Sequence, residues 1–510
     1  MGTETELKLA LPARALRQAE RLSWLRKLAT RTVSHKRLIS DYFDTKKLKL
    51  YQGGATLRIR KIGSKDFQTI KGRNGVCALA RFEREDEITS RRPELRYAKG
   101  TPFEKLLPRK RRRKLRRVFR TDVRRSVMDI RLNDSDIEVA FDRGTIIAGR
   151  RSQPIHELEL ELKNGHAKDL AAIARRLHET VPVAFEAQAK ADRGYALSKG
   201  KKDAAAYAEP ITLTRDQPAG AAFSQIGLSC LQHLMANQNA VIAGDPEGVH
   251  QMRVGLRRLR AAMSLFRDMI TGHDAEEIRR ELKWLSAELG PARDLDVMTK
   301  EAIVPLRESN PDKPEIAVLE QDVKRNRREE FERAARAVST SRFRELAFKA
   351  ALWLIDGDWC RSRGAAAELR ARPISSVAAD ILARRSRKIT KRAKRLEKLD
   401  GRRRHKLRIA VKKLRYGCDF FESRFGHLKA QRRYGRALKE LQSCLGKLND
   451  IRVHAEKAHR LANPRRRGPG RIQKAYAMGF LTGREQKLAR GLVSTATSAA
   501  RKLTHTRKFW

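Results

Sequence analysis

Thr3-Glu4-Thr5-Glu6-Leu7-Lys8-Leu9, near the N-terminus, alternates charged side chains with threonine and leucine. Alternate side chains of a β-strand lie on the same face, so the stretch predicts a strand with Glu4, Glu6 and Lys8 on one face. The opposite face would pack into a core. Taken alone, such a charged face is more typical of a solvent-exposed strand than of a binding site.

A second stretch, Glu157-Leu158-Glu159-Leu160-Glu161-Leu162-Lys163, repeats this pattern with an acidic residue at every second position and a final lysine. Three carboxylates on one strand face repel each other, and a hard divalent cation would offset that repulsion. A solvated edge strand is the alternative interpretation. Because the pattern occurs twice in one region, we favour a site.

Further segments between these two stretches also alternate apolar and charged residues, namely 57–60, 67–71, 79–85, 119–125 and 137–141. Short strands separated by Gly, Asn and Asp predict an antiparallel sheet that closes into a barrel. Charges of both signs favour a closed barrel with a polar lumen over an exposed sheet. Arginine and lysine side chains in such a lumen repel each other until an anion enters, so we expect an anionic ligand.

Composition supports an anionic partner, because 114 Lys and Arg residues against 60 Asp and Glu give a formal net charge of +54. This excess predicts binding to nucleic acid, an anionic membrane or polyphosphate. The five cysteines form no C-x-x-C pair, which argues against a disulfide framework and a zinc site. No apolar run has the length of a membrane span and no signal peptide is evident, so we expect a cytoplasmic protein without a membrane partner.

The N-terminal region resembles the CYTH family, also called the triphosphate tunnel metalloenzymes. The resemblance spans residues 1–200 and rests on motifs in this order: Glu4-x-Glu6-x-Lys8, Leu57-Arg58-x-Arg60, Gln68-Thr69-x-Lys71-Gly72, Phe119-x-Thr121 through Arg125, Glu138 through Asp142-x-Gly144, Glu159-x-Glu161-x-Lys163 and Lys190-x-x-Arg193-Gly194-Tyr195. It implies an eight-stranded antiparallel β-tunnel that binds a triphosphate unit with Mg²⁺ or Mn²⁺. Family members hydrolyse inorganic triphosphate, thiamine triphosphate or RNA 5′ ends, or cyclise ATP.

The resemblance also implies roles for individual residues, with Lys8 helping to activate water. The metal-binding carboxylates would be Glu4, Glu6, Glu159, Glu161, Asp142 and Glu157. The triphosphate-binding cations would be Arg58, Arg60, Lys71, Arg125 and Lys190. Such a set fits phosphoryl transfer, which depends mainly on cations and metal ions placed along the developing charge.

The basic segment 109–117 departs from the strand pattern, and we interpret it as a solvated loop or helix. Guidance of polyanions to the tunnel mouth is the alternative. Residues 201–219, rich in Lys, Ala and Pro, are expected to be a linker. Beyond them, helical periodicity replaces the strand pattern.

The C-terminal region contains an internal repeat, in which a histidine-led basic stretch from His250 to Arg260 aligns with one from His405 to Arg415. Each is followed by a leucine-glycine pair and then by Arg293-Asp294 or Asn449-Asp450. The repeat predicts two bundle-sized helical units, about 220–360 and 375–490, and a tail at 491–510.

Cationic side chains of each copy fall at i, i+3, i+7 and i+10 and so form one helix stripe. The two stripes are His250, Arg253, Arg257 and Arg260 in the first copy, and His405, Arg408, Lys412 and Arg415 in the second. A solvated face is the alternative. If the stripes face each other about a pseudo-twofold axis, they form a basic trough suited to a linear polyanion. Neither histidine has the neighbours of a metal site or of a nucleophile's base.

This second region resembles the CHAD domain, a conserved-histidine helical domain that is often fused to CYTH. The resemblance covers about 220–490 and implies an all-α, pseudo-symmetric fold that binds inorganic polyphosphate, with Lys283 and Lys439 supporting the stripes. The expected fold is therefore multidomain α+β, with a β-tunnel followed by a tandem helical bundle.

The two resemblances together lead us to expect metal-dependent hydrolysis of inorganic triphosphate in a cytoplasmic protein that associates with polyphosphate granules. A non-catalytic polyphosphate-binding protein is the alternative from another class, and adenylate cyclase or thiamine triphosphatase activity is the alternative within the tunnel. Nucleic-acid binding is expected only as a non-specific effect of charge, because 6% aromatic residues offer few stacking partners.

Overall fold

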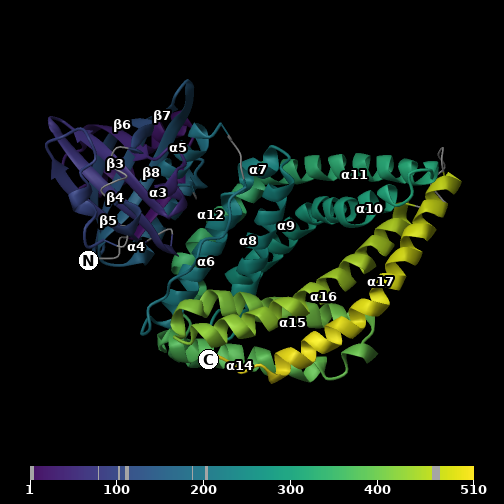
Figure 1. Ribbon diagram of the computed structural model, residues 1–510. Helices are drawn as coiled ribbons and strands as arrows, with labels where there is room; N and C mark the ends of the chain where they lie inside the picture. The colour runs from purple at the N-terminus through teal and green to yellow at the C-terminus, as the bar shows by residue number, and fades with distance from the viewer. Residues whose placement is uncertain are drawn as a thin grey trace.

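The computed structural model describes residues 5–77, 80–101, 104–108, 114–186, 188–200, 205–461 and 471–510. Glu4 and residues 109–113 of the basic segment lie outside the described residues. The chain forms an N-terminal β-sheet region and a C-terminal helical region that pack side by side (Figure 1). Among the described helices, none is both long and apolar enough to cross a membrane.

The N-terminal region is built on one antiparallel sheet with strand order β5-β4-β3-β2-β6-β7-β8-β1-β9. Its strands are β1 (Thr5–Ala10), β2 (Ser34–Asp44), β3 (Ala55–Ile62), β4 (Lys65–Cys77), β5 (Ala80–Ile88), β6 (Arg116–Leu132), β7 (Ser135–Ala148), β8 (Arg151–Asn164) and β9 (Ala184–Phe185). Helices α1 (Ala13–Glu20), α2 (Ser23–Lys27), α3 (Lys49–Gln52) and α4 (Ala167–Thr180) lie between the strands, and α5 (Lys190–Ser198) follows β9.

The prediction of an eight-stranded closed barrel is wrong in two respects, although the antiparallel pairing is confirmed. The sheet has nine strands, and in the described part of the chain β5 and β9 form its two edges. The ninth strand explains part of the difference, because Phe185 and Ala184 pair with Leu9 and Ala10 on the edge of β1 that would otherwise face β5. We therefore describe an open sheet with a charged face.

One face of this sheet is apolar and carries the core. Leu7 and Leu9 of β1 pack there with Leu158 and Leu160 of β8, and all four are almost fully buried. Helices α1 and α4 contribute to the same hydrophobic cluster. Burial of each leucine stabilises the fold by about 1.5–3 kcal/mol. This face fixes the strand orientation and directs the alternate, charged side chains to the opposite face.

The C-terminal region is helical, as predicted. It contains α6 (Ala219–Met235), α7 (Gln238–Ile242), α8 (Pro246–Leu265), α9 (His273–Met298), a π-helix (Thr299–Ile303), α10 (Val304–Glu308), α11 (Pro314–Ser339), α12 (Ser341–Asp356), α13 (Ala365–Ala371), α14 (Ile374–Ala393), α15 (Gly401–Phe421), α16 (Leu428–Leu461) and α17 (Arg471–His505). Helix α17 crosses the expected boundary at 490, and Ala496, Ala499 and Leu503 are buried in the main core.

The two stripe-bearing helices, α8 and α15, begin in the same way. The carboxylate of Asp245 accepts a hydrogen bond from the backbone N–H of Glu247 at 3.0 Å, and that of Asp400 accepts one from Arg403 at 2.7 Å. These N-caps satisfy backbone donors that a helix start leaves without partners. The repeated sequence thus places each leading histidine one turn into a capped helix.

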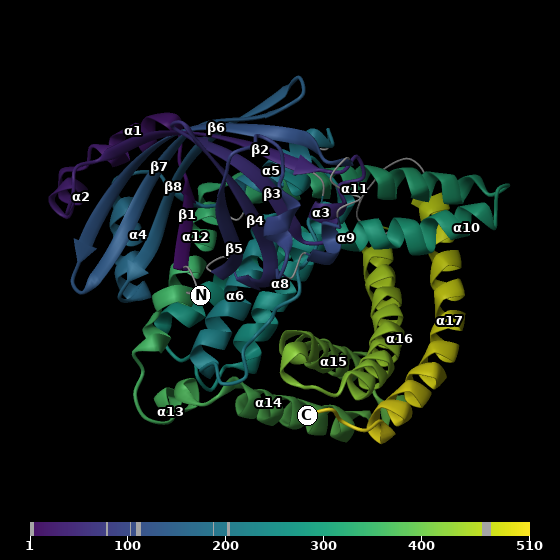
Figure 2. The same cartoon turned by 60° about the vertical axis from the view of Figure 1, so that its left-hand side comes forward.

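The two regions contact each other through α12, which packs on α4 and β9 (Figure 2). The His178 ring of α4 stacks on Phe348 at a centroid distance of 4.1 Å, and its Nε2 lies 2.6 Å from Glu345. Arg175 donates to the backbone carbonyl of Asp356 at 2.9 Å. Since β9 pairs with β1, α12 packs on the strand next to the one that carries Glu6 and Lys8.

Candidate functional site

The strand register brings the charged residues predicted from separate motifs onto one face of the sheet. Lys8 lies opposite Glu159 in the β1–β8 pair, and Asp142 lies opposite Glu157 in the β7–β8 pair. Arg125 of β6 lies opposite Asp142. The sequence predicted the faces of these strands, and the pairing now makes their side chains neighbours.

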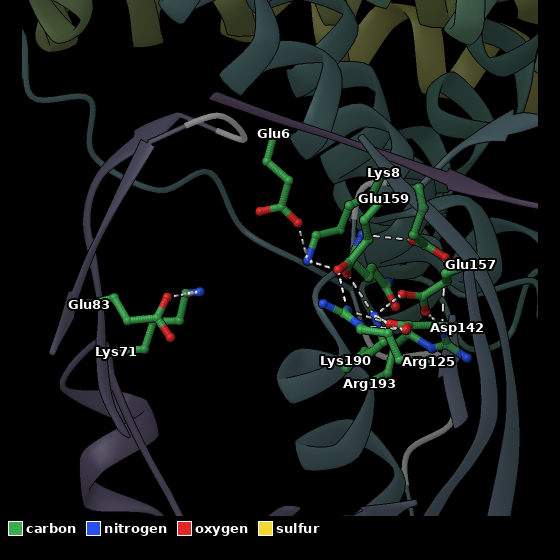
Figure 3. A network of polar contacts seen from close by, with 12 residues as sticks. Glu6, Lys8, Lys71, Glu83, Arg125, Asp142, Glu157, Glu159, Lys190 and Arg193 are labelled. Atoms are coloured by element: carbon green, nitrogen blue, oxygen red, sulfur yellow. Dashed lines mark hydrogen bonds and ion pairs between the residues drawn. The ribbon is translucent and has the colours of Figure 1, made fainter. Parts of the chain in front are cut away.

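An acidic cluster formed by Asp142, Glu157 and Glu159 is the centre of this face. All three residues are buried, and one carboxylate oxygen from each lies within 4.8 Å of the others. The Lys190 ammonium, at the first position of α5, lies 2.8, 2.6 and 2.8 Å from Asp142, Glu157 and Glu159, respectively (Figure 3). In spite of burial, these carboxylates hold the pKa of Lys190 well above its usual range.

Arginine side chains complete the surroundings of the acidic cluster. Arg125 donates two hydrogen bonds of 2.7 Å to Asp142 and one of 2.5 Å to Glu159, while Arg193 of α5 contacts Glu157. Burial acts to raise the pKa of Glu159, but Lys190, Lys8 and Arg125 outweigh it and hold the pKa well below its usual range. The cluster is therefore anionic, and cations balance its charge.

Lys8 connects this cluster to the first strand motif, since its Nζ lies 2.8 Å from Glu6 and 3.1 Å from Glu159. Glu161, also expected to bind metal, lies one strand repeat farther along β8. Its carboxylate contacts Lys163 at 2.5 Å, and the three-residue acidic cluster does not include it. Glu4 lies outside the described residues. The structure thus brings together Asp142, Glu157 and Glu159. Glu6 is connected to this cluster only indirectly among the described residues, because Lys8 contacts both Glu6 and Glu159.

The predicted phosphate-binding cations Arg58, Arg60 and Lys71 lie on the same face, on β3 and β4. Arg58 lies 3.0 Å from Glu83 and 3.6 Å from Glu85, two carboxylates of β5, and Lys71 also contacts Glu83. Figure 3 shows the Lys71–Glu83 pair set apart from the acidic cluster. The face therefore carries two charged groups, one from β1, β6, β7, β8 and α5 and one from β3, β4 and β5.

Arg60 differs from its neighbours because no carboxylate of the described chain lies within 4.0 Å of its guanidinium. Among the described residues, its Nε donates only to the Ser40 hydroxyl, at 3.3 Å. Burial, followed by the nearby Arg58 charge, lowers the pKa of Arg60 to about 10. A part-buried cation that lacks an anionic partner is suited to receive an anionic ligand.

Four residues of this face were not predicted as site residues: Tyr42, Glu83, Glu85 and Arg193. Tyr42 lies opposite Arg58 in the sheet and stacks on Phe119 at a centroid distance of 4.3 Å. Burial acts to raise the pKa of Tyr42, but Arg58, Arg60 and Lys71 lower it. The alternation within 79–85 indicated the strand face of Glu83 and Glu85, and the Lys190-x-x-Arg193 spacing included Arg193. The sequence could not predict the partners of these three residues, because they depend on strand register and on where α5 packs.

In the helical region α8 packs on α15, and cations of the two basic stripes lie close enough to shift each other's pKa, Arg257 that of Lys412 and Arg408 that of Arg253. Burial, and then the charges of Arg257 and Arg408, lower the pKa of Lys412 to about 7. Burial also lowers the pKa of Arg253 to about 10, where Asp294, 3.6 Å away, opposes the effect of the surrounding arginines. We call Arg253, Arg257, Arg408 and Lys412 the basic trough.

Several nitrogen atoms at the trough have no hydrogen-bond partner within the described part of the chain. They are Nδ1 of His250 and Nε of Arg257 and of Arg408, and all three are buried. Burial lowers the pKa of His250 to about 4, with Arg293 adding to the effect, so this ring is neutral near pH 7. His405 instead pairs through Nδ1 with the Asn449 side chain at 2.8 Å. Buried polar nitrogens without partners are rare in folded proteins, and they are consistent with a ligand at this place.

The remaining predicted stripe residues lie farther from this cluster. Arg260 is exposed and donates to the Ser286 hydroxyl at 3.0 Å, and Arg415 is half-buried. Lys283 and Lys439 are exposed on α9 and α16, and no hydrogen bond or ion pair among the described residues joins either to the trough. Gly290 of α9 makes room for the Arg253 guanidinium, because a Cβ there would lie 3.0 Å from Nη1.

Both regions match the models of known protein families. The model of the CYTH domain matches residues 2–195, and that of the CHAD domain matches residues 225–459. The chain carries a CYTH domain followed by a CHAD domain. The acidic cluster and the cations of β3 and β4 lie within the CYTH domain, and the basic trough lies within the CHAD domain.

Individual relatives cover different parts of the chain. The inorganic triphosphatase of Haemophilus influenzae is 43% identical over 83 residues, which are 16% of this chain and 24% of that relative. The chain thus spans about a quarter of that relative's length. The crystal structure of the CHAD domain from the plant Ricinus communis is 28% identical, with a TM-score of 0.52 over 60% of this chain and 98% of that chain. PptA from Streptomyces chartreusis is 17% identical, with a TM-score of 0.42 over 56% of this chain and 100% of that chain.

Proposed function

We propose that the CYTH domain hydrolyses inorganic triphosphate to diphosphate and phosphate with a divalent metal ion, while the CHAD domain binds inorganic polyphosphate. The observation that carries the first half is the sheet face on which three buried carboxylates lie near four cations from three elements. The relative named as an inorganic triphosphatase supports the same reaction.

The residues present fit a hard divalent cation such as Mg²⁺ or Mn²⁺, the metals that the family resemblance implies. Carboxylate oxygens are the ligands that these ions prefer, and Asp142, Glu157 and Glu159 would hold one. The Lys190 ammonium lies 2.6 Å from Oε2 of Glu157, yet this buried oxygen accepts no well-aligned hydrogen bond from the described residues. When bound, the ion would neutralise charge that develops on the phosphate and lower the pKa of water.

Residues of the chain itself would bind the phosphate chain and orient the attacking water. Arg58, Arg60 and Lys71 would bind the phosphate chain through charge-assisted hydrogen bonds, with Arg60 free of any competing carboxylate in the described structure. Lys8, held by Glu6 and Glu159, would orient the attacking water. The water oxygen would form a bond to the terminal phosphorus while the bond to the bridging oxygen breaks, diphosphate would leave, and the water would lose a proton to solvent or to a product oxygen.

A substrate panel tests this reaction directly. Purified full-length protein is incubated with inorganic triphosphate, long-chain polyphosphate, thiamine triphosphate or ATP, with Mg²⁺, Mn²⁺ or EDTA, and the products are resolved. We expect diphosphate and phosphate from triphosphate only with metal present. Faster turnover of thiamine triphosphate, or formation of cyclic AMP from ATP, would replace our assignment with one of the tunnel alternatives.

Polyphosphate binding by the CHAD domain is supported by the facing stripes and by the buried donors that lack partners. A long polyanion could contact both helices and neutralise cations that now repel each other. In a binding assay, the Arg253→Ala/Arg408→Ala double variant is expected to lose at least tenfold in affinity for long-chain polyphosphate. Unchanged affinity would contradict this half of the proposal.

Two outcomes would favour the alternatives. Polyphosphate binding without turnover of any triphosphate would favour a non-catalytic binding protein. Equal affinity for DNA and polyphosphate at moderate salt would favour a general polyanion-binding role.

The cytoplasmic location and the association with polyphosphate granules are also part of the proposal, and imaging of the tagged full-length protein would test them.

A further inference from the structure

The sheet of the CYTH domain carries a hollow of about 530 Å³ on the face that lies away from the acidic cluster. It extends over β2, β6 and β7 to the β7–β8 turn. We call it the outer hollow, and five arginines line it: Arg37, Arg124, Arg143, Arg150 and Arg151. The strand arginines alternate along the chain with Arg125 and Asp142 of the acidic-cluster face, so they lie on the opposite face of the sheet.

The strand register places three of these arginines in one row across the sheet. Arg37 of β2 lies opposite Arg124 of β6, and Arg124 lies opposite Arg143 of β7. Side chains at such positions have Cβ atoms about 4.5–5.5 Å apart, and like charges placed there destabilise the sheet. An anion bound over the row would relieve this repulsion.

The carboxylates next to the row are already engaged. Asp122 accepts hydrogen bonds of 3.0 and 2.7 Å from Arg37, and Glu20 of α1 accepts one from Arg143. Among the residues that line the outer hollow, Asp122 is the one acidic residue against five arginines. The hollow therefore has a net positive charge that an anionic ligand would balance.

Three arginines of the outer hollow have no carboxylate within 4.0 Å in the described part of the chain. Arg124 is the middle member of the row, and Arg150 and Arg151 belong to the β7–β8 turn. All three are exposed. Their guanidinium groups are available for charge-assisted hydrogen bonds to a ligand.

The hollow is suited to a flexible chain of phosphate groups. Guanidinium groups match phosphate oxygens in bidentate pairs. Arg143 lies about 17 Å along β7 from the last strand residue, Ala148, so a single phosphate group cannot contact both the row and the turn. None of the described residues that line the hollow is aromatic, so the bases of a single nucleic-acid strand would have no stacking partner. A DNA duplex, with a persistence length of about 50 nm, is too stiff to follow the hollow.

We propose that the outer hollow binds a segment of linear polyphosphate. Phosphate groups of the chain contact Arg124 in the row and Arg150 and Arg151 at the turn, and they neutralise cations that have no carboxylate partner. The CYTH domain would thus hold polyphosphate on the face opposite the acidic cluster. This site is separate from the basic trough, and the inference depends on neither half of the proposed function.

Binding of long-chain polyphosphate to the full-length protein tests the proposal, with EDTA present to prevent metal-dependent hydrolysis of the polymer. Because the basic trough is expected to bind the same polymer, the test uses the Arg253→Ala/Arg408→Ala protein as its background. Adding Arg124→Gln/Arg150→Gln removes two charges of the hollow and keeps long polar side chains. This change is expected to weaken the remaining affinity by about tenfold or more.

The matched control is Lys46→Gln/Lys47→Gln in the same background. It removes two exposed charges of the CYTH domain that do not line the hollow. Its affinity for polyphosphate is expected to stay within about twofold of the background protein. Circular dichroism checks the fold of each variant, and Arg150→Gln/Arg151→Gln, confined to the turn, replaces the first pair if that pair does not fold.

Four results would overturn the proposal. The first is that no polyphosphate binding remains in the background protein, and the second is that Arg124→Gln/Arg150→Gln leaves the affinity unchanged. The third is an equal loss in the lysine control, which would show a general effect of net charge. The fourth is that duplex DNA or polyglutamate binds the same arginines more tightly than polyphosphate, which would assign the hollow to nucleic acid or to an acidic protein.

The result can be separated from the tests of the proposed function. Triphosphate hydrolysis by Arg124→Gln/Arg150→Gln is expected to stay within about twofold of the wild type, because both residues lie on the face opposite the acidic cluster. Failure of the wild type to hydrolyse triphosphate would refute the catalytic half of the proposed function and leave the binding result unchanged. Comparison of the wild type with Arg253→Ala/Arg408→Ala tests the trough by itself.

Discussion

Lys190 lies between three carboxylates at the place where the acidic cluster most needs positive charge. Three buried carboxylates would repel each other strongly, and the ammonium with Arg125 and Arg193 offsets that repulsion. A divalent cation could serve the same carboxylates, so metal affinity depends on how readily these cations turn toward an incoming phosphate chain. In the proposed function Lys190 would therefore have a double role, as a counter-ion without substrate and as a phosphate ligand with it.

Lys412 gives a prediction about pH at the residue scale. Burial, with Arg257 and Arg408, lowers its pKa to about 7, so the free protein loses this charge as the pH rises through 7. Bound polyphosphate favours the charged form of Lys412, so this lysine takes up a proton from solvent when polyphosphate binds. Affinity is therefore expected to fall about tenfold between pH 7 and pH 8.5. The unliganded fold changes in the opposite sense, gaining stability as the pH rises above 7, because the unfolded lysine stays charged.

Lys412→Arg provides the control for this prediction, since arginine stays protonated over the whole range. Titrations of long-chain polyphosphate at pH 6, 7 and 8.5 should show a nearly flat affinity in Lys412→Arg and a decline in the wild type. Parallel declines in both proteins would show that another group controls the pH dependence.

The capped starts of α8 and α15 give a prediction at the element scale. Asp400 accepts from the backbone N–H of Arg403, and His405 lies one turn further on. Asp400→Ala is expected to lower the unfolding free energy of the helical domain by about 1 kcal/mol. Asp400→Asn keeps a capping oxygen and should be close to wild type. Thermal unfolding followed by circular dichroism measures both, and equal midpoints for Ala and Asn would contradict a capping role.

Sequence predicts elements well where periodicity is long and clear. The alternation in β1 and β8 gave the correct faces for Glu6, Lys8 and Glu159, because a buried leucine follows each charged residue. It could not place Glu83 beside Lys71, since strand order and register arise from tertiary packing. The two-residue strand β9 is too short for any periodic signal, and it changes which edge of β1 is free.

In the helical region, too, the sequence predicted the residues that share a helix face but not the contacts that depend on tertiary packing. Repeated spacing predicted two stripes on α8 and α15, and their facing arrangement is present. The exposed positions of Lys283 and Lys439 did not follow from spacing, because the rotation of α9 and α16 depends on which apolar residues they bury. Divergence between the copies, such as Asp296 against Arg452, was visible as a residue difference but had no meaning without the surrounding helices.

At the scale of the whole molecule, the two domains share one hydrophobic cluster that runs from β1 and β8 through α4 into α12 and the helical bundle. Contacts of His178 with Glu345 and Phe348 add polar and aromatic links to this interface. The net charge of +54 surrounds both sites and would draw phosphate chains to either domain. In the proposed function the molecule would therefore combine a general attraction for polyanions with one face that holds a metal ion and a triphosphate.

The central claim is that the buried acidic cluster supports metal-dependent triphosphate hydrolysis. Initial rates of phosphate release from inorganic triphosphate, with saturating Mg²⁺ or Mn²⁺, are compared for the wild type, Glu159→Gln and Glu161→Gln. Our account predicts a loss of at least roughly 100-fold in Glu159→Gln, because a buried member of the cluster loses its charge. Glu161→Gln, which alters the carboxylate paired with Lys163, should stay within about threefold of the wild type. Equal rates in all three proteins would contradict the account.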